Sequence, residues 1–155
     1  MNKFLLSVHV LAAIIFIGPV TVAASMFPPI ARRELAADQP QTAVLRTLHR
    51  ISTVYAIGGI AVPVFGIAVG AGLGVLGEVW LVISMALTAV AAGVLVVAVL
   101  PVQAEVIAAA DQDGATRTAL LPRARRLSMT TGMFGLLWAT VTVLMIVRPG
   151  STTGV

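Results

Sequence analysis

The sequence predicts an all-α fold, a polytopic membrane protein with four transmembrane helices in a bundle, in an order that allows two tandem helical hairpins. Composition is the first indication, because 59% of the residues are hydrophobic and only 10% are charged, against about 25% charged in an average soluble domain. The charges are also clustered, and they leave uncharged stretches at 4–24, 51–74, 79–100 and 127–147. A helix crosses a bilayer in about 20 residues, and these stretches lack the alternation of a transmembrane strand. Residues 1–155 therefore form a single four-helix transmembrane domain.

The first span, 4–24, contains an ionisable side chain near its start, His9 in "SVHVLAAIIFIGP". Burial disfavours a charged imidazole, and the spans hold no carboxylate that could pair with one. We expect a neutral ring that hydrogen-bonds to a neighbouring helix or lies at the outer interface. Pro19 predicts a kink in this helix, and Pro28 with Pro29 predicts its end, because proline lacks the amide hydrogen of a regular helix.

The second and fourth spans, 51–74 and 127–147, carry small residues at helical spacing. Transmembrane helices associate through close packing and hydrogen bonds, and small residues permit close approach. We therefore predict contact with another helix, either of this chain or of a second one. The predicted packing residues are Gly66, Gly70, Gly74, Ser128, Gly132, Gly135 and Ala139. Pro63 predicts a kink in the second span.

The long segments between spans, 25–50 and 101–126, hold eight of the ten Lys and Arg residues. Because basic residues near helix ends stay on the cytoplasmic side, we expect these two loops in the cytoplasm and both termini outside. The pI of about 11.2 follows from this asymmetry, favours anionic lipids at the cytoplasmic face and requires no nucleic-acid partner. Good helix formers extend the second span upstream through "QTAVLRTLHR" and the third downstream as far as Gly114.

An internal repeat relates the two halves of the chain. "AVLRTLHRISTVYAIGGI", from Ala43, and "ALLPRARRLSMTTGMFGL", from Ala119, share Ala, Leu, Arg, Ser and Gly in register. Each segment leads a basic helix end into a span. Two hairpins in the same orientation predict a pseudo-twofold axis along the membrane normal, as in parallel-repeat transporters.

Catalytic groups are missing from the sequence, which predicts that the protein is not an enzyme. The chain has no cysteine, no acidic pair and no nucleophile–base motif, and its spans lack the charged groups on which proton pumps rely. His9 lies in the outer part of the first span, and His49 lies at the cytoplasmic entrance to the second. The first helix rises about 22 Å from His9 to Ala24, at its cytoplasmic end. Because two axial ligands of one metal lie only about 4 Å apart, one protomer cannot bind haem through both histidines. A site formed by His9 and Met145 stays open.

The chain resembles DUF2269, a family of small bacterial integral membrane proteins. The resemblance rests on "HVLAAIIFIG" in the first span, the basic entry "RARRLS" and the closing "MFGLLWATVTVLMIVRPG", and it spans the whole chain. It implies a membrane fold and brings no catalytic residues. The "HxLAA" opening is also similar to membrane domains of the copper-resistance type, but Phe16 and Pro19 depart from their Trp and second Gly.

These observations favour a non-catalytic integral membrane subunit that packs against and stabilises a larger membrane complex, such as a respiratory one, in a bacterial cell membrane. Other membrane subunits are then its expected partners, and we expect no cofactor. The alternative is a membrane protein that binds haem b or a metal through His9. A third class, a small transporter, is supported by the repeat and the proline kinks.

Overall fold

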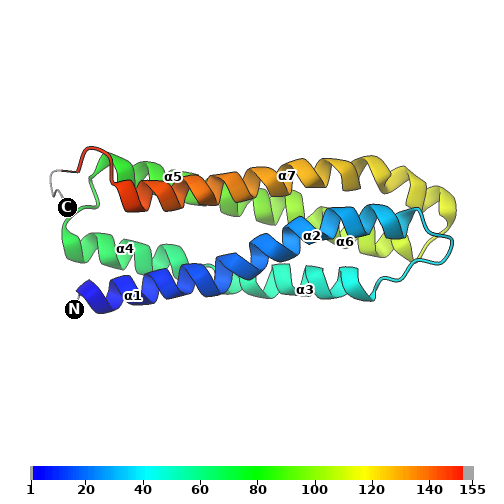
Figure 1. The fold of residues 1–155 in the computed structure, drawn as a ribbon, viewed down its shortest axis with the longest axis horizontal. Coiled ribbons are helices and arrows are strands. Elements are labelled where there is room, and N and C mark those ends of the chain that lie inside the picture. The colour runs from blue at the N-terminus through cyan, green and yellow to red at the C-terminus, as the bar shows by residue number, and fades with distance from the viewer. Residues whose placement is uncertain (1, 152–155) are drawn as a thin grey trace.

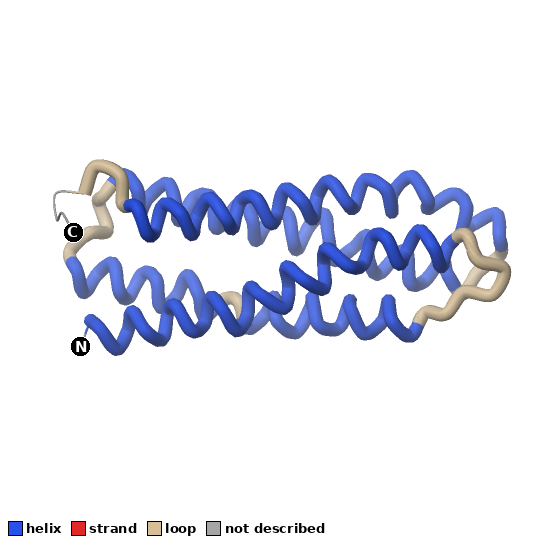
Figure 2. The backbone as a smooth tube through the Cα atoms, viewed as in Figure 1, coloured by secondary structure: helices blue, strands red, loops and turns tan. Residues whose placement is uncertain are grey.

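The computed structural model describes residues 2–151, and these form four long helical columns (Figure 1). The columns are Lys3–Leu35, Ala43–Leu73, Val79–Ala110 and Gly114–Val147. Each is long and apolar enough to cross a membrane, and the described residues contain no strand (Figure 2). The predicted four-helix membrane fold is confirmed.

Three of the columns are interrupted along their length. The first consists of α1 (Asn2–Ala12), the π-helical segment η1 (Ala13–Ile17) and α2 (Gly18–Leu35). The second consists of α3 (Ala43–Gly58) and α4 (Ala61–Leu73), and the third of α5 (Val79–Gly93), the π-helical segment η2 (Val94–Val99) and α6 (Leu100–Ala110). The fourth is the single helix α7 (Gly114–Val147).

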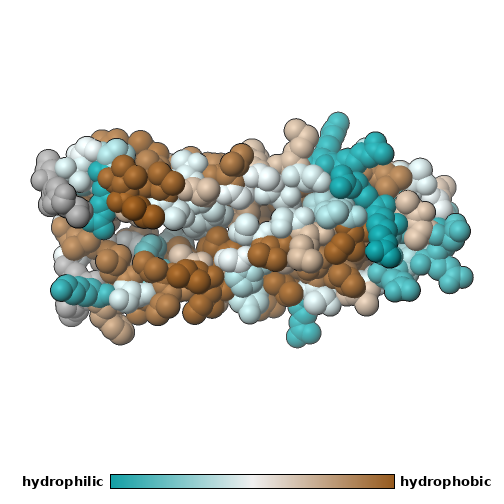
Figure 3. All heavy atoms as spheres, viewed as in Figure 1, coloured by the Kyte–Doolittle hydropathy of each residue, from teal (hydrophilic) through white to brown (hydrophobic). Residues whose placement is uncertain are grey.

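The columns are longer than a bilayer is thick. They contain 31 to 34 residues, which at about 1.5 Å per residue gives roughly 46–51 Å, against about 30 Å of hydrocarbon. The start of α1 and the end of α7 lie at one end of the bundle (Figure 1), and hydrophilic side chains gather at the other (Figure 3). At the basic end the helices therefore project past the predicted spans.

This projection corrects the predicted loops at 25–50 and 101–126. Only residues 36–42 and 111–113 connect the columns at this end without helix. Gly114 was predicted to end a helix, but it is the first residue of α7, because the Asp113 side chain accepts a hydrogen bond from the Thr116 amide and caps the helix there.

Pro28 and Pro29 do not end the first helix as predicted. They lie inside α2, which continues to Leu35, and Pro28 is fully buried. Beyond the prolines, Ala31 and Leu35 pack into the core. Packing against neighbouring helices thus outweighs the local preference of proline for a helix end, as membrane bundles permit.

Backbone irregularities precede three other prolines, whereas Pro122 lies inside the uninterrupted helix α7. The segment η1 ends two residues before Pro19, η2 ends two residues before Pro101, and Gly59 and Ile60 interrupt the second column before Pro63. These are positions where a missing amide and a ring clash disturb regular helix. The two predicted proline sites, Pro19 and Pro63, both coincide with an irregularity.

The core lies mainly in the basic half of the bundle, where α2, α3, α6 and α7 pack together. Its fully buried large side chains include Phe27, Leu45, Val106, Leu127 and Phe134. In the other half the packing is pairwise, α1 against α4 and α5 against α7. Within the first hairpin α1 packs against α4 and α2 against α3, within the second α5 and α6 pack against α7, and α2 also packs extensively against α7 across the two hairpins.

Candidate functional site

His9 is part-buried on α1 and hydrogen-bonds across to α4. Its Nδ1 lies 2.9 Å from the backbone oxygen of Val62. A carbonyl only accepts hydrogen bonds, so Nδ1 is the donor and carries the ring proton. Nε2 is then the nitrogen with a free lone pair, the arrangement in which a backbone-anchored histidine can bind a metal.

Two of the three predicted glycines on α4 make room for neighbouring side chains. A Cβ on Gly66 would lie 2.9 Å from His9 Cε1, so this glycine accommodates the imidazole ring. A Cβ on Gly70 would lie 2.9 Å from a methyl of Leu81 on α5. Gly74 has another role than the predicted one: its φ of 70° is left-handed, and it caps α4.

The predicted stripe on α7, formed by Ser128, Gly132, Gly135 and Ala139, is only partly covered by the described helices, and Ser128 and Gly135 are half-buried. Gly132 and Ala139 are exposed, and no heavy atom lies within 4 Å of a Cβ built on Gly132 or Gly135. The helix packs through the adjacent face instead, which contains Ala124, Leu127, Thr131, Phe134 and Val141. Contact of this small-residue stripe with another helix stays a prediction, and it concerns a second chain.

A polar pair that the sequence analysis did not single out joins α3 to α6. His49 Nδ1 lies 3.0 Å from Oε1 of Gln103, whose side chain is fully buried. Gln103 Nε2 and the buried Ser52 hydroxyl have no hydrogen-bond partner among the described residues. The one sequence feature that could have indicated this pair is the side-chain amide of Gln103, which follows the uncharged stretch 79–100 in "LPVQAEV". The pair ties the two hairpins together at the basic half.

Two ion pairs join neighbouring elements at the basic end. Arg46 on α3 pairs with Asp111 at 2.6 Å, and Arg123 on α7 pairs with Glu105 on α6. Both pairs are partly exposed, so each adds little stability. The Thr116 amide, which donates to the Asp113 carboxylate, lowers the pKa of that carboxyl below its ordinary value of 3.8.

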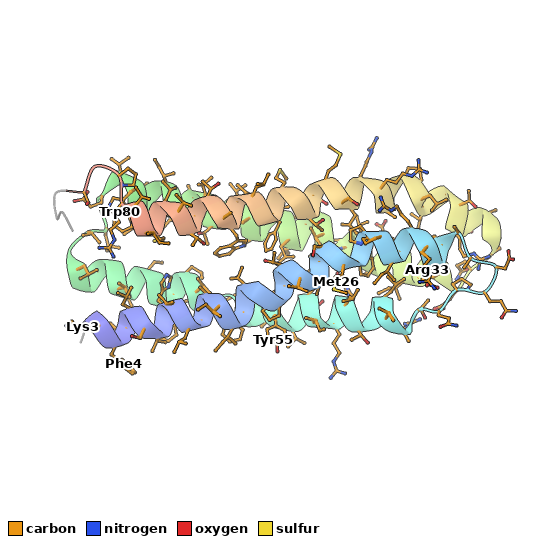
Figure 4. The ribbon with its side chains drawn as sticks, viewed as in Figure 1. Lys3, Phe4, Met26, Arg33, Tyr55 and Trp80 are labelled. Carbon is orange, nitrogen blue, oxygen red and sulfur yellow. The ribbon has the colours of Figure 1, made fainter. Side chains whose placement is uncertain are left out.

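At the end of the bundle where α1 begins and α7 ends, a basic side chain lies over an aromatic ring. The Arg148 guanidinium lies 5.5 Å from the centre of the Trp80 ring, a cation–π contact. Trp80 is only 5% exposed, and it lies at the same end as Lys3, far from Arg33 (Figure 4). This contact links the start of α5 to the residue after α7.

An apolar cavity of about 370 Å³ lies between the two hairpins, where Gly59 and Ile60 interrupt the second column. Its wall includes Val20, Leu95, Phe134 and Trp138. The indole N–H of Trp138 is buried without a hydrogen-bond partner among the described residues. The sequence analysis gave no indication of this cavity.

His9 and its candidate partner Met145 lie on helices that pack against different neighbours. Among the described residues, no three His, Cys, Asp or Glu side chains gather as a metal site would require. The candidate partner of His9, Met145, is on α7, which packs against α2, α5 and α6, whereas α1 packs against α4.

Comparison with known proteins agrees with the membrane fold. A family model described as "Predicted integral membrane protein (DUF2269)" matches residues 3–149. The chain belongs to the DUF2269 family. No curated protein and no solved structure matches it. Membership in DUF2269 thus supports an integral membrane protein and brings no site residue to the chain.

Proposed function

We propose that this DUF2269 protein is a non-catalytic integral membrane subunit that packs against and stabilises a larger membrane complex. The observation that carries the proposal is the small-residue stripe of α7, which the described helices cover only in part. Gly132 and Gly135 would each accept a Cβ without any contact inside 4 Å, although small residues in transmembrane helices are typical of helix–helix interfaces. A helix of a second protein is the occupant that this surface fits.

The limited burial of the spans also supports a partner. In the most apolar 18-residue window of each column, only 11% to 22% of the residues are buried inside the protein. Large side chains such as Leu136 and Ile146 on α7 are more than 70% exposed. Lipid covers such apolar surface without a free-energy penalty. The same exposed surface is also available to neighbouring subunits around most of the bundle.

For location we propose the bacterial cell membrane, with the connections 36–42 and 111–113 in the cytoplasm and both termini outside. The support is the charge asymmetry, since eight of the ten Lys and Arg residues lie at the end that carries these connections. Anionic lipid headgroups are then the expected neighbours of the exposed arginines.

For the complex itself we propose a respiratory one, whose other subunits would supply the redox chemistry that this chain lacks. The test is purification of the protein from native membranes in mild detergent, followed by identification of its partners and by difference spectra. Gly132→Leu and Gly135→Leu should lose the partners while the bundle stays folded. Gly93→Leu is the matched control, because Gly93 on α5 also has open space around it. Equal loss in the control, or retention in all variants, contradicts the proposal.

A second candidate, haem b or metal binding through His9, is favoured by one observation, the Nδ1–Val62 hydrogen bond, which in a neutral ring leaves the lone pair on Nε2. A second axial ligand would have to come from another subunit, because His49 bonds to Gln103 in the basic half. The visible spectrum of the purified complex tests this candidate. A Soret band that disappears in His9→Gln supports it, whereas identical spectra of parent and variant contradict it.

A further inference from the structure

Exposed arginines gather over α2 and α7 at the basic end, where hydrophilic side chains form a patch across both helices (Figure 3). Arg32 on α2 and Arg125 on α7 are both exposed. The next residue on each helix, Arg33 and Arg126, is exposed as well. Among the described residues, neither Arg32 nor Arg125 has an ion-pair partner or a side-chain hydrogen bond. Their guanidinium groups are therefore available to another molecule.

The acidic side chains of the basic end do not neutralise this patch. Glu105 and Asp111 each form an ion pair with another arginine. Glu34, the acidic residue of α2, has a side chain that is only 13% exposed and lies 3.9 Å from Arg33. The helix α7 contains no acidic residue. The face formed by α2 and α7 thus carries an excess of positive charge, which suits an anionic group.

Helix direction brings Arg32 and Arg125 toward the same layer. The helices α2 and α7 pack against each other and run in opposite directions (Figure 1). From the end of the bundle where α1 begins and α7 ends, Arg32 lies about 44 Å along its column and Arg125 about 33 Å along α7. Long side chains on a helix point back toward its N-terminus. Arg32 therefore points toward the spans and Arg125 away from them, so the two side chains approach each other across about 10 Å of helix.

This layer adjoins exposed apolar surface. Arg125 precedes the uncharged stretch 127–147 by two residues, or about 3 Å of helix, and lipid headgroups occupy roughly 5–7 Å on each side of the hydrocarbon. Farther along α7, at spacings of four and eleven residues that keep them on the same side of the helix as Arg125, Met129 and Leu136 are 76% and 71% exposed. A molecule that fits both features has an anionic group in the headgroup layer and an apolar chain beside it.

We propose that Arg32 and Arg125 bind the phosphate of an anionic phospholipid, with an acyl chain along Met129 and Leu136. Arginine presents several N–H donors in a plane that matches phosphate oxygens, so two arginines from adjoining helices can hold one phosphate between them. The inference rests on the contact with anionic headgroups proposed above and narrows it to one site on one face of the bundle. It does not depend on the partner subunit, whose docking is tested separately by the glycine variants of α7.

Native mass spectrometry of the protein purified in detergent tests the site, because it counts each lipid that the protein retains. The parent should bind its first phosphatidylglycerol more tightly than phosphatidylcholine with the same acyl chains. The double variant Arg32→Gln/Arg125→Gln should weaken this binding about 20- to 30-fold, or about fivefold for each arginine. The matched control is Arg46→Gln/Arg50→Gln, which removes the same charge from the same end on α3. Arg50 is exposed and lies about 34 Å from the end of α4, level with Arg125.

At an ionic strength of about 0.15 M, charges more than about 8 Å away are largely screened, so the control should change binding less than about twofold. Equal weakening in both double variants would mean attraction to the basic end as a whole, which overturns the site but leaves the general headgroup contact. Equal affinity of the parent for the two lipids overturns both. Displacement of phosphatidylglycerol by an equal concentration of inorganic phosphate overturns the lipid as the ligand. Both double variants should keep the circular dichroism spectrum of the parent, because the replaced side chains are exposed.

Discussion

The contact between His9 and Gly66 allows a sharp prediction about Gly66→Ala. The new methyl carbon would lie 2.9 Å from Cε1 of the imidazole, whereas ordinary van der Waals contacts begin at 3.4 Å. The ring must therefore retreat by about 0.5 Å, the difference between these two distances. A retreat of that size lengthens the 2.9 Å bond from Nδ1 to the Val62 oxygen to the edge of hydrogen-bonding distance.

Two opposing effects set how much Gly66→Ala changes the free energy of unfolding. Loss of the hydrogen bond costs about 1 kcal/mol, or nearer 0.6 kcal/mol by averages for interhelical bonds in membranes. Alanine in place of glycine inside a helix contributes up to about 1 kcal/mol in the other direction. We expect Gly66→Ala alone to be close to neutral, and to be stabilising when His9→Ala has already removed the ring.

A double-mutant cycle separates the two effects. Unfolding in mixed micelles of the parent, Gly66→Ala, His9→Ala and the double variant should give a coupling free energy of about 0.6–1.5 kcal/mol. Gly93→Ala is the matched control, because Gly93 has no neighbour within 4 Å of an added Cβ, and it should be additive with His9→Ala. If Gly66→Ala and His9→Ala are also additive within about 0.3 kcal/mol, the ring does not depend on this glycine.

Three further predictions concern topology, helix capping and packing. In whole cells, Ala37→Cys and Gln112→Cys should resist an impermeant thiol reagent while Gly77→Cys reacts, and the opposite labelling pattern would reverse the orientation. The folded-state pKa of Asp113 is lowered, so its capping stabilises α7 above pH 3.8 and is lost as the pH falls through the folded-state pKa. Asp113→Asn should remove this acid dependence of the thermal unfolding midpoint. An unchanged dependence on pH would contradict the capping role of Asp113. Gly70→Leu should lower the unfolding midpoint far more than Gly70→Ala, because a Cβ at this position already meets the movable ends of leucine side chains. Similar midpoints for both variants would mean that α4 and α5 are not closely packed there.

The four spans could be predicted from local sequence because hydrocarbon offers no partner for backbone amides and carbonyls. An uncharged stretch of sufficient length in lipid must therefore be helical, and the distribution of Arg46, Arg123 and their neighbours shows which helix ends lie together. For the same reason Pro28 was misleading. It prevents helix formation locally, but in the bundle it is fully buried inside α2, and the neighbouring helices decide its conformation.

What only the tertiary structure decided is which face of each helix meets a neighbour. In water an apolar stripe marks the inner face, but in lipid both faces are apolar, so periodicity carries no such information. Gly66 and Gly132 have the same small-residue spacing, yet one adjoins His9 and the other lies in open space. The pairing of His49 with Gln103, 54 residues apart, and the unpaired indole of Trp138 depend on how the two hairpins pack, which no local stretch of sequence encodes.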